Sequence, residues 1–142
     1  MTADAQLQLL VLTKNSESWE PAPFTSRMAT RLRRAAKSVK PPPSTGRWFK
    51  ADYSVYVALL VDAPGQPGLS LYVGRTHVSD RHRYLRQKAG WQAGAGNVEH
   101  WGVGLLPELY SHLLELDWDQ VLVVEPAMAA ALRTTGMTVS QN

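Results

Sequence analysis

Two tyrosines and a glycine stand where they could do chemistry together. Tyr56 ends the triplet Ser54-Val55-Tyr56, and Tyr72 opens the triplet Tyr72-Val73-Gly74. Both triplets lie in short runs rich in Val, Tyr and Leu, which are typical of β-strands. In neighbouring strands the two phenols would lie side by side, and Gly74 would permit a close approach. Together with a cation for phosphate and a carboxylate for a metal ion, such phenols would form a site that cleaves phosphodiester bonds.

The elements around the two triplets indicate how they would be positioned. A strand over about 53–61, a loop rich in Pro and Gly over 62–68 and a strand over 69–73 predict an antiparallel hairpin. A helix capped by Ser79 or Asp80 is expected to follow and to end near Ala89. This helix would carry several arginines and one histidine beside the hairpin.

The rest of the chain predicts further helices and strands. A helix from Thr25 or Ser26 to about Val39 has an apolar stripe on one face and arginines on another, and three prolines at 41–43 end it. The other expected elements are a strand or short helix at 6–13, a loop at 15–23, a strand at 99–106, a helix at 107–116, a strand at 121–124 and a helix at 127–135 that begins with Pro126. The expected fold is α+β, with a small three-stranded, mainly antiparallel sheet flanked by helices and a basic N-terminal helical extension.

Charge is divided along the chain. Thirteen of the fifteen basic residues lie in 21–88, against three acidic residues, whereas 89–142 holds one basic residue against six acidic ones. This division can form a basic face that attracts polyanions although the net charge is only +3.

The chain has no cysteine, which excludes a disulfide framework and a thiolate zinc site. No apolar run approaches the ~20 residues that span a bilayer, and the N-terminus lacks the order of a signal peptide. A cytoplasmic protein without membrane partners is therefore expected.

The order of these residues resembles the GIY-YIG nuclease superfamily over about residues 50–142. The Gly-Ile-Tyr signature would be Ser54-Val55-Tyr56, and the Tyr-Ile-Gly signature would be Tyr72-Val73-Gly74. In that family an arginine on the next helix, a glutamate on a later helix and commonly an asparagine near the end complete the set. This chain offers Arg81 or Arg83, then Glu125, then Asn142.

The resemblance implies a role for each of these residues. Tyr56 would act as a base or orient water, Tyr72 would hydrogen-bond the phosphate or the nucleophile, and Arg81 would bind phosphate through its guanidinium fork. Glu125 would hold a divalent ion, Mg²⁺ or else Mn²⁺, because hard oxygen ligands suit such ions. Contacts to the substrate are implied for Gly74, Arg75, Arg83 and Asn142. His77 and His82 are further candidates for substrate contact or proton transfer.

Two of these assignments have alternatives. The usual position of the family arginine falls near His82, so Arg81 and Arg83 compete for the role. Pro126 directly follows Glu125, and a proline inside a helix removes a hydrogen bond and clashes with the preceding turn. Glu115 is therefore an alternative metal ligand.

The resemblance implies a metal-dependent endonuclease that acts on DNA in preference to RNA. The nuclease domain would occupy 47–142 and the extension 1–46, where Arg31 and Arg34 of the basic helix would follow phosphates. Trp48 and Phe49, just after the prolines, would stack on bases or pack on the core. So short a chain would need a homodimer, a specificity partner or low sequence specificity. The alternatives are a nucleic-acid-binding module whose catalytic site has decayed and an unrelated α+β protein-interaction domain.

Overall fold

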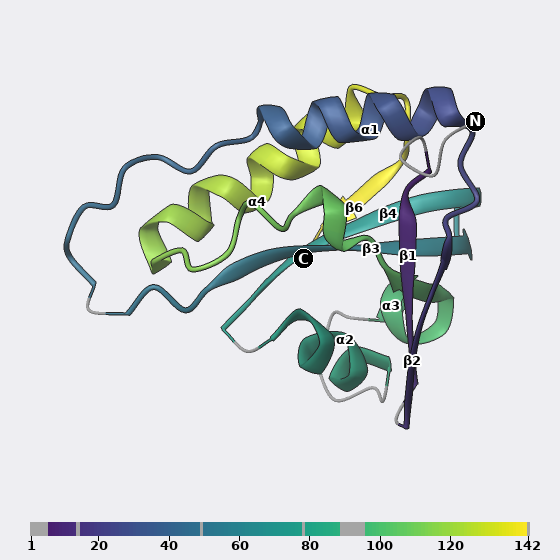
Figure 1. The fold of residues 1–142 in the computed structure, drawn as a ribbon, viewed down its shortest axis with the longest axis horizontal. Helices are drawn as coiled ribbons and strands as arrows, with labels where there is room; N and C mark the ends of the chain where they lie inside the picture. Colours follow the sequence, from purple (N-terminus) through teal and green to yellow (C-terminus); the bar gives the residue numbers. More distant parts are fainter. Residues whose placement is uncertain (1–5, 14, 49, 78, 89–95, 142) are drawn as a thin grey trace.

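A six-stranded mixed sheet with the strand order β2-β1-β5-β3-β4-β6 forms the centre of the fold (Figure 1). The computed structural model describes residues 6–13, 15–48, 50–77, 79–88 and 96–141. Every neighbouring pair in the sheet is antiparallel except β4 and β6, which are parallel. The strands are β1 (Gln8–Thr13), β2 (Ser16–Pro21), β3 (Ser54–Ala63), β4 (Gln66–Thr76), β5 (Gly102–Leu105) and β6 (Val139–Gln141).

Helices cover both faces of the central strands (Figure 1). α1 and α4 lie on one side of β3 and β4, and α2 and α3 lie on the other side. The helices are α1 (Ser26–Ser38), α2 (Asp80–Lys88), α3 (Gly96–Trp101), α4 (Trp118–Arg133) and the short 3₁₀ helix η2 (Pro107–Leu109). Within the described residues, no helix is both long and apolar enough to cross a bilayer.

The α+β class is confirmed, but the expected three-stranded sheet is wrong. Strand β1 pairs with β5, and β2 extends the sheet by pairing with β1 along its whole length. Every residue of β2 is exposed, so this edge strand has no buried face and therefore no alternation of apolar residues to reveal it. The segment before residue 47 thus shares the sheet with the segment after it, and its helix α1 packs on α4.

The β3–β4 hairpin follows the sequence prediction and is longer than expected. The pair keeps one register from Ser54↔Thr76 to Val61↔Leu69, with an irregularity between Val61 and Ala63. The turn uses left-handed residues at Asp62 (φ +54°), Gly65 (φ +72°) and Gly68 (φ +76°). The Asp62 carboxylate accepts a hydrogen bond from the Gly68 amide at 2.8 Å, which closes the loop.

Helix α1 matches its prediction closely. Thr25 caps it by accepting from the Met28 amide at 3.1 Å. Ala29, Leu32 and Ala36 form its buried face. The helix stops at the residue before Val39, where three prolines follow shortly afterwards.

Helix α4 replaces a predicted strand and a predicted separate helix. Asp117 and Gln120 form a capping box, which starts the helix before the apolar run 121–124 that is typical of a strand. Pro126 lies inside the helix on its exposed side. The carbonyl of Leu122, which loses its intrahelical donor there, belongs to an exposed residue and can be solvated.

The segment between α3 and α4 also differs from expectation. The predicted strand 99–106 begins as the end of α3 and becomes β5 only at Gly102. The predicted helix 107–116 is the single 3₁₀ turn η2, after which the chain runs along β3. Tyr53 and Leu116 exchange two backbone hydrogen bonds of 2.9 and 2.8 Å there. The backbone of Leu116 therefore pairs with Tyr53, the residue before β3, and does not continue a helix.

Candidate functional site

Tyr56 and Tyr72 lie on one face of the β3–β4 hairpin. The register pairs Tyr56 with Gly74 and Ala58 with Tyr72, so the two tyrosines are diagonal neighbours. Their ring centroids are 6.1 Å apart and their planes are tilted by 39°. Both side chains are buried, with exposed fractions of 0% for Tyr56 and 2% for Tyr72. The two phenols are therefore side by side, inside the core.

Gly74 is required for this packing because the ring of Tyr56 lies across it. A Cβ atom at Gly74 would lie 2.4 Å from the Tyr56 Oη and 2.5 Å from its Cζ. Carbon atoms in contact are normally about 3.5–4.0 Å apart. A larger residue at this position would displace Tyr56.

Arg75 and Glu125 form an ion pair on the opposite face of the sheet. Arg75 lies opposite Val55 in the register, one residue out of phase with Tyr72 and Gly74. Its Nη1 donates to Oε1 of Glu125, a residue of α4, at 3.1 Å. The Glu125 side chain is 3% exposed and that of Arg75 is 35% exposed. The guanidinium therefore lies between the buried carboxylate and the surface.

The Glu125 carboxylate is only half satisfied. Its Oε2 is buried and has no hydrogen-bond partner among the described residues. Burial raises the pKa of Glu125 above its usual 4.5, although the Arg75 guanidinium opposes that effect. A cation or a proton at Oε2 would therefore stabilise this buried carboxylate.

The sheet separates the two halves of the predicted site. Glu125 belongs to α4, so Arg75, which pairs with it, lies on the α4 side of the sheet. Tyr56, Tyr72 and Gly74 are out of phase with Arg75 and lie on the other face, which α2 and α3 cover (Figure 1). Successive side chains of a strand point to opposite faces. Tyr72 and Arg75 are three residues apart in the sequence, and this odd spacing already implies that their side chains lie on opposite faces.

The two candidate arginines of α2 differ in their partners. Arg81 Nε donates to Glu17 of β2 at 3.3 Å, and its Nη1 lies 3.6 Å from the Asp80 carboxylate. Arg83 instead has a buried Nε with no hydrogen-bond partner among the described residues. Arg81 thus pairs with acidic residues, whereas the unpartnered Nε of Arg83 is buried. His82 also lies in α2, but its side chain is outside the described part of the structure.

Tyr110 joins the tyrosine side of the sheet, and the sequence contained no signal for it. Its Oη donates to Asp80 Oδ2 at 2.6 Å. Burial, together with the Asp80 charge, raises the pKa of Tyr110 well above its usual range, and Tyr56 adds to this effect. Tyr84 of α2 is buried too, which raises its pKa to about 12. These phenols are protonated at neutral pH and suit packing better than proton abstraction.

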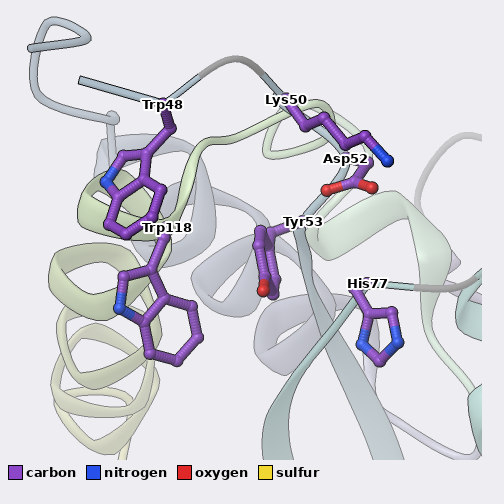
Figure 2. A pocket seen from close by; sticks show the side chains of 6 residues that line it. All are labelled: Trp48, Lys50, Asp52, Tyr53, His77 and Trp118. Carbon is purple, nitrogen blue, oxygen red and sulfur yellow. The ribbon is translucent and has the colours of Figure 1, made fainter. Parts of the chain in front are cut away.

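An open aromatic pocket lies next to the Arg75–Glu125 pair. Its volume is about 520 Å³, and Figure 2 shows the rings that form its walls. It is lined by Trp48, Lys50, Asp52, Tyr53, His77 and Trp118. Tyr53 lies 5.2 Å from Trp118 and 6.1 Å from His77, measured between ring centroids. The Arg75 Cζ lies 5.4 Å from the centre of the Trp118 ring, so Arg75 connects the pocket to Glu125.

The segment after the prolines holds Trp48 beside the start of α4. Ser44 donates to the buried Asp117 carboxylate at 2.7 Å, and Thr45 donates to Asp119 at 3.1 Å. The Gln120 side chain donates to the Pro42 carbonyl at 2.8 Å. These bonds bring Trp48 and Trp118, 70 positions apart, to one pocket. The sequence singled out Trp48 but not Trp118.

The remaining predicted residues lie in several places. Arg31 and Arg34 line a second hollow on the exposed side of α1 with Arg27 and Thr30, with a volume of about 470 Å³. Glu115, the alternative metal ligand, is exposed in the turn before α4 with φ +57°. Asn142 and Phe49 lie outside the described residues.

Within the described part of the chain, no cluster of three or more His, Asp or Glu side chains is arranged to hold a metal ion. Glu125 nevertheless offers one buried carboxylate oxygen that lacks a partner among the described residues. Mg²⁺ commonly takes one or two protein carboxylates and completes its shell with water and substrate phosphates. Glu125 would supply one such carboxylate oxygen, and water and phosphate would have to supply the other ligands.

Comparison of the chain with family models, with curated proteins and with solved structures finds no match.

Proposed function

We propose that this domain binds nucleic acid beside Arg75 and hydrolyses its phosphodiester bonds with Mg²⁺ or Mn²⁺ held at Glu125, with DNA preferred to RNA. The proposal depends on one observation. Among the described residues, a buried carboxylate has one oxygen paired with an arginine and the other unpaired, next to an open pocket with cationic neighbours.

Arg75 would hold the phosphate. Glu125 takes one guanidinium N–H, and an arginine has five such donors in a planar fork that matches phosphate oxygens. Its side chain is 35% exposed, so it can be reached from the surface while it contacts Glu125. The aromatic ring of Trp118 beneath it limits its orientations.

Glu125 would hold the ion through its second, buried oxygen. A bound divalent ion lowers the pKa of its water and neutralises charge on the phosphoryl oxygens. It would also remove the cost of burying the Glu125 charge, since two cationic neighbours would then face one carboxylate. In this proposal Tyr56 and Tyr72 support the hairpin from the opposite face and do not touch the reacting phosphate.

A second candidate is a nucleic-acid-binding module without catalysis. Burial of Tyr56 and Tyr72 on the face away from Glu125 favours it, because the residues of the resembled family would not converge on one phosphate. Binding would then depend on salt through phosphate contacts alone.

The test is nicking of supercoiled plasmid in Mg²⁺ or Mn²⁺, with EDTA as the metal-free control. Wild-type protein should cut, and Glu125→Gln and Arg75→Ala should not. Glu115→Gln, which removes the exposed carboxylate before α4, should cut like wild type. Cutting that survives Glu125→Gln but not Glu115→Gln would reject the site. Salt-sensitive binding without any cutting would instead establish the second candidate.

A further inference from the structure

We propose that the aromatic pocket binds one unpaired nucleobase, so that the nucleic acid recognised is single-stranded or has a base flipped out of its helix. This inference rests on the proposed function, because it names the substrate class for the site at Arg75. The pocket's lining, its charge and its position each support it.

The lining suits a flat, aromatic ligand. Two tryptophans and a tyrosine from two separate parts of the chain contribute ring surface to one hollow (Figure 2). Trp48 is 41% exposed although its segment is fastened to α4 on the N-terminal side by the hydrogen bonds of Ser44 and Thr45. A large ring held at the surface and not buried in the core is available for stacking. The volume of about 520 Å³ lies within the range of small-molecule sites.

The charge around the pocket favours a base attached to phosphates over a cationic ligand. The Arg47 guanidinium lies 4.9 Å from the centre of the Trp48 ring, and Arg75 lies 5.4 Å from that of Trp118. Lys50 adds a third cation at the rim. Cations therefore already occupy faces of both tryptophans, and an ammonium ligand would meet like charge. Asp52 is the one carboxylate among the described residues of the lining, and it can accept a hydrogen bond from a base amino or imino group.

The position of the pocket places a phosphate next to the base. Arg75 contacts both Trp118 and Glu125, so the nucleotide whose base stacks in the pocket would have a neighbouring phosphate within reach of the guanidinium. A paired base inside a duplex cannot enter such a hollow, because its faces are covered by its neighbours. The site therefore requires an unstacked nucleotide.

The test measures binding of a short fluorescent single-stranded oligothymidylate in EDTA, where no cleavage can occur. Trp48→Ala should weaken binding by about 5- to 150-fold, which is the range for the loss of one base stacked on an aromatic side chain. Trp48→Phe should retain most of the affinity, because it keeps a ring. Trp19→Ala is the matched control, since Trp19 is 52% exposed on β2, and it should bind like wild type.

An abasic oligomer of the same length tests whether the base is recognised. It keeps the phosphates but should bind wild-type protein more weakly than the oligothymidylate does, and Trp48→Ala should not weaken it further. Equal affinity of the two oligomers, or of Trp48→Ala and wild type for the oligothymidylate, would overturn the proposal. A trimethyl-lysine peptide that binds while the oligothymidylate does not would overturn it as well.

The two proposals can fail separately. Base-dependent binding without plasmid nicking would reject the proposed nuclease activity and support the base-binding pocket. Nicking by a protein whose oligonucleotide binding ignores Trp48 would reject the base pocket alone.

Discussion

The contact between Gly74 and Tyr56 predicts that a single methyl group at Gly74 destabilises the fold. In Gly74→Ala the new Cβ atom would lie 2.4 Å from the Tyr56 Oη, about 1 Å inside normal contact. Tyr56 is completely buried and its ring faces that of Tyr72, so it has little room to move away. The strain must therefore appear as lost stability.

The expected cost follows from overpacking in a buried region. Inserting an extra methyl into a packed core costs about 1–3 kcal/mol, and the backbone gain from replacing glycine returns about 0.4–1 kcal/mol. We expect Gly74→Ala to lower the free energy of unfolding by about 1–2 kcal/mol. For a chain of 142 residues this corresponds to a fall in Tm of about 3–7 °C.

The assay is urea unfolding followed by far-UV circular dichroism, applied to a double-mutant cycle. Tyr56→Leu removes the atoms that the new methyl group would strike, so Gly74→Ala should cost almost nothing in that background. The two substitutions should then be less destabilising together than the sum of their separate effects, by about 1–2 kcal/mol. Strict additivity, or a Gly74→Ala protein as stable as wild type, would refute the argument that Tyr56 crosses β4 at Gly74.

Two further predictions concern the start and the middle of α4. Asp117→Ala removes the cap to the Gln120 amide (2.8 Å) and the bond from Ser44 (2.7 Å), so thermal unfolding should show a loss of about 1–2 kcal/mol; an unchanged Tm would contradict the capping role. Burial raises the pKa of folded Glu125 above its usual 4.5, so the folded state binds this proton more tightly than the unfolded state does. Stability should therefore fall as the pH rises from about 4.5 through the raised pKa, and urea titrations should show that Glu125→Gln removes this decline. A decline of equal size in Glu125→Gln would show that another group causes it.

Local patterns were enough to predict the elements whose side chains alternate or cap in the usual way. The β3–β4 hairpin follows from two β-branched and aromatic runs around a Pro-Gly loop, and α1 follows from Thr25 and its apolar stripe. Strand β2 lies in a segment that was predicted as a loop, because all its residues are exposed and show no apolar alternation. Its hydrogen bonds to β1 decide its place in the sheet. The first half of α4 was not predicted as a helix because its run of branched residues and Pro126 both argue against helix locally, whereas the Asp117 cap and packing on the sheet favour it.

For the candidate site, the sequence by itself predicted that Tyr56 and Tyr72 are neighbours, which follows from strand pairing. It grouped Arg75 with them, although the two-residue period of a strand places Arg75 on the other face. Only the tertiary structure brought Glu125 to Arg75 and Trp48 to Trp118. Those pairs are 50 and 70 positions apart, and their meeting depends on how α4 and the segment after the prolines pack on the sheet. No local pattern of residues encodes that packing, because it is a balance of contacts over the whole core.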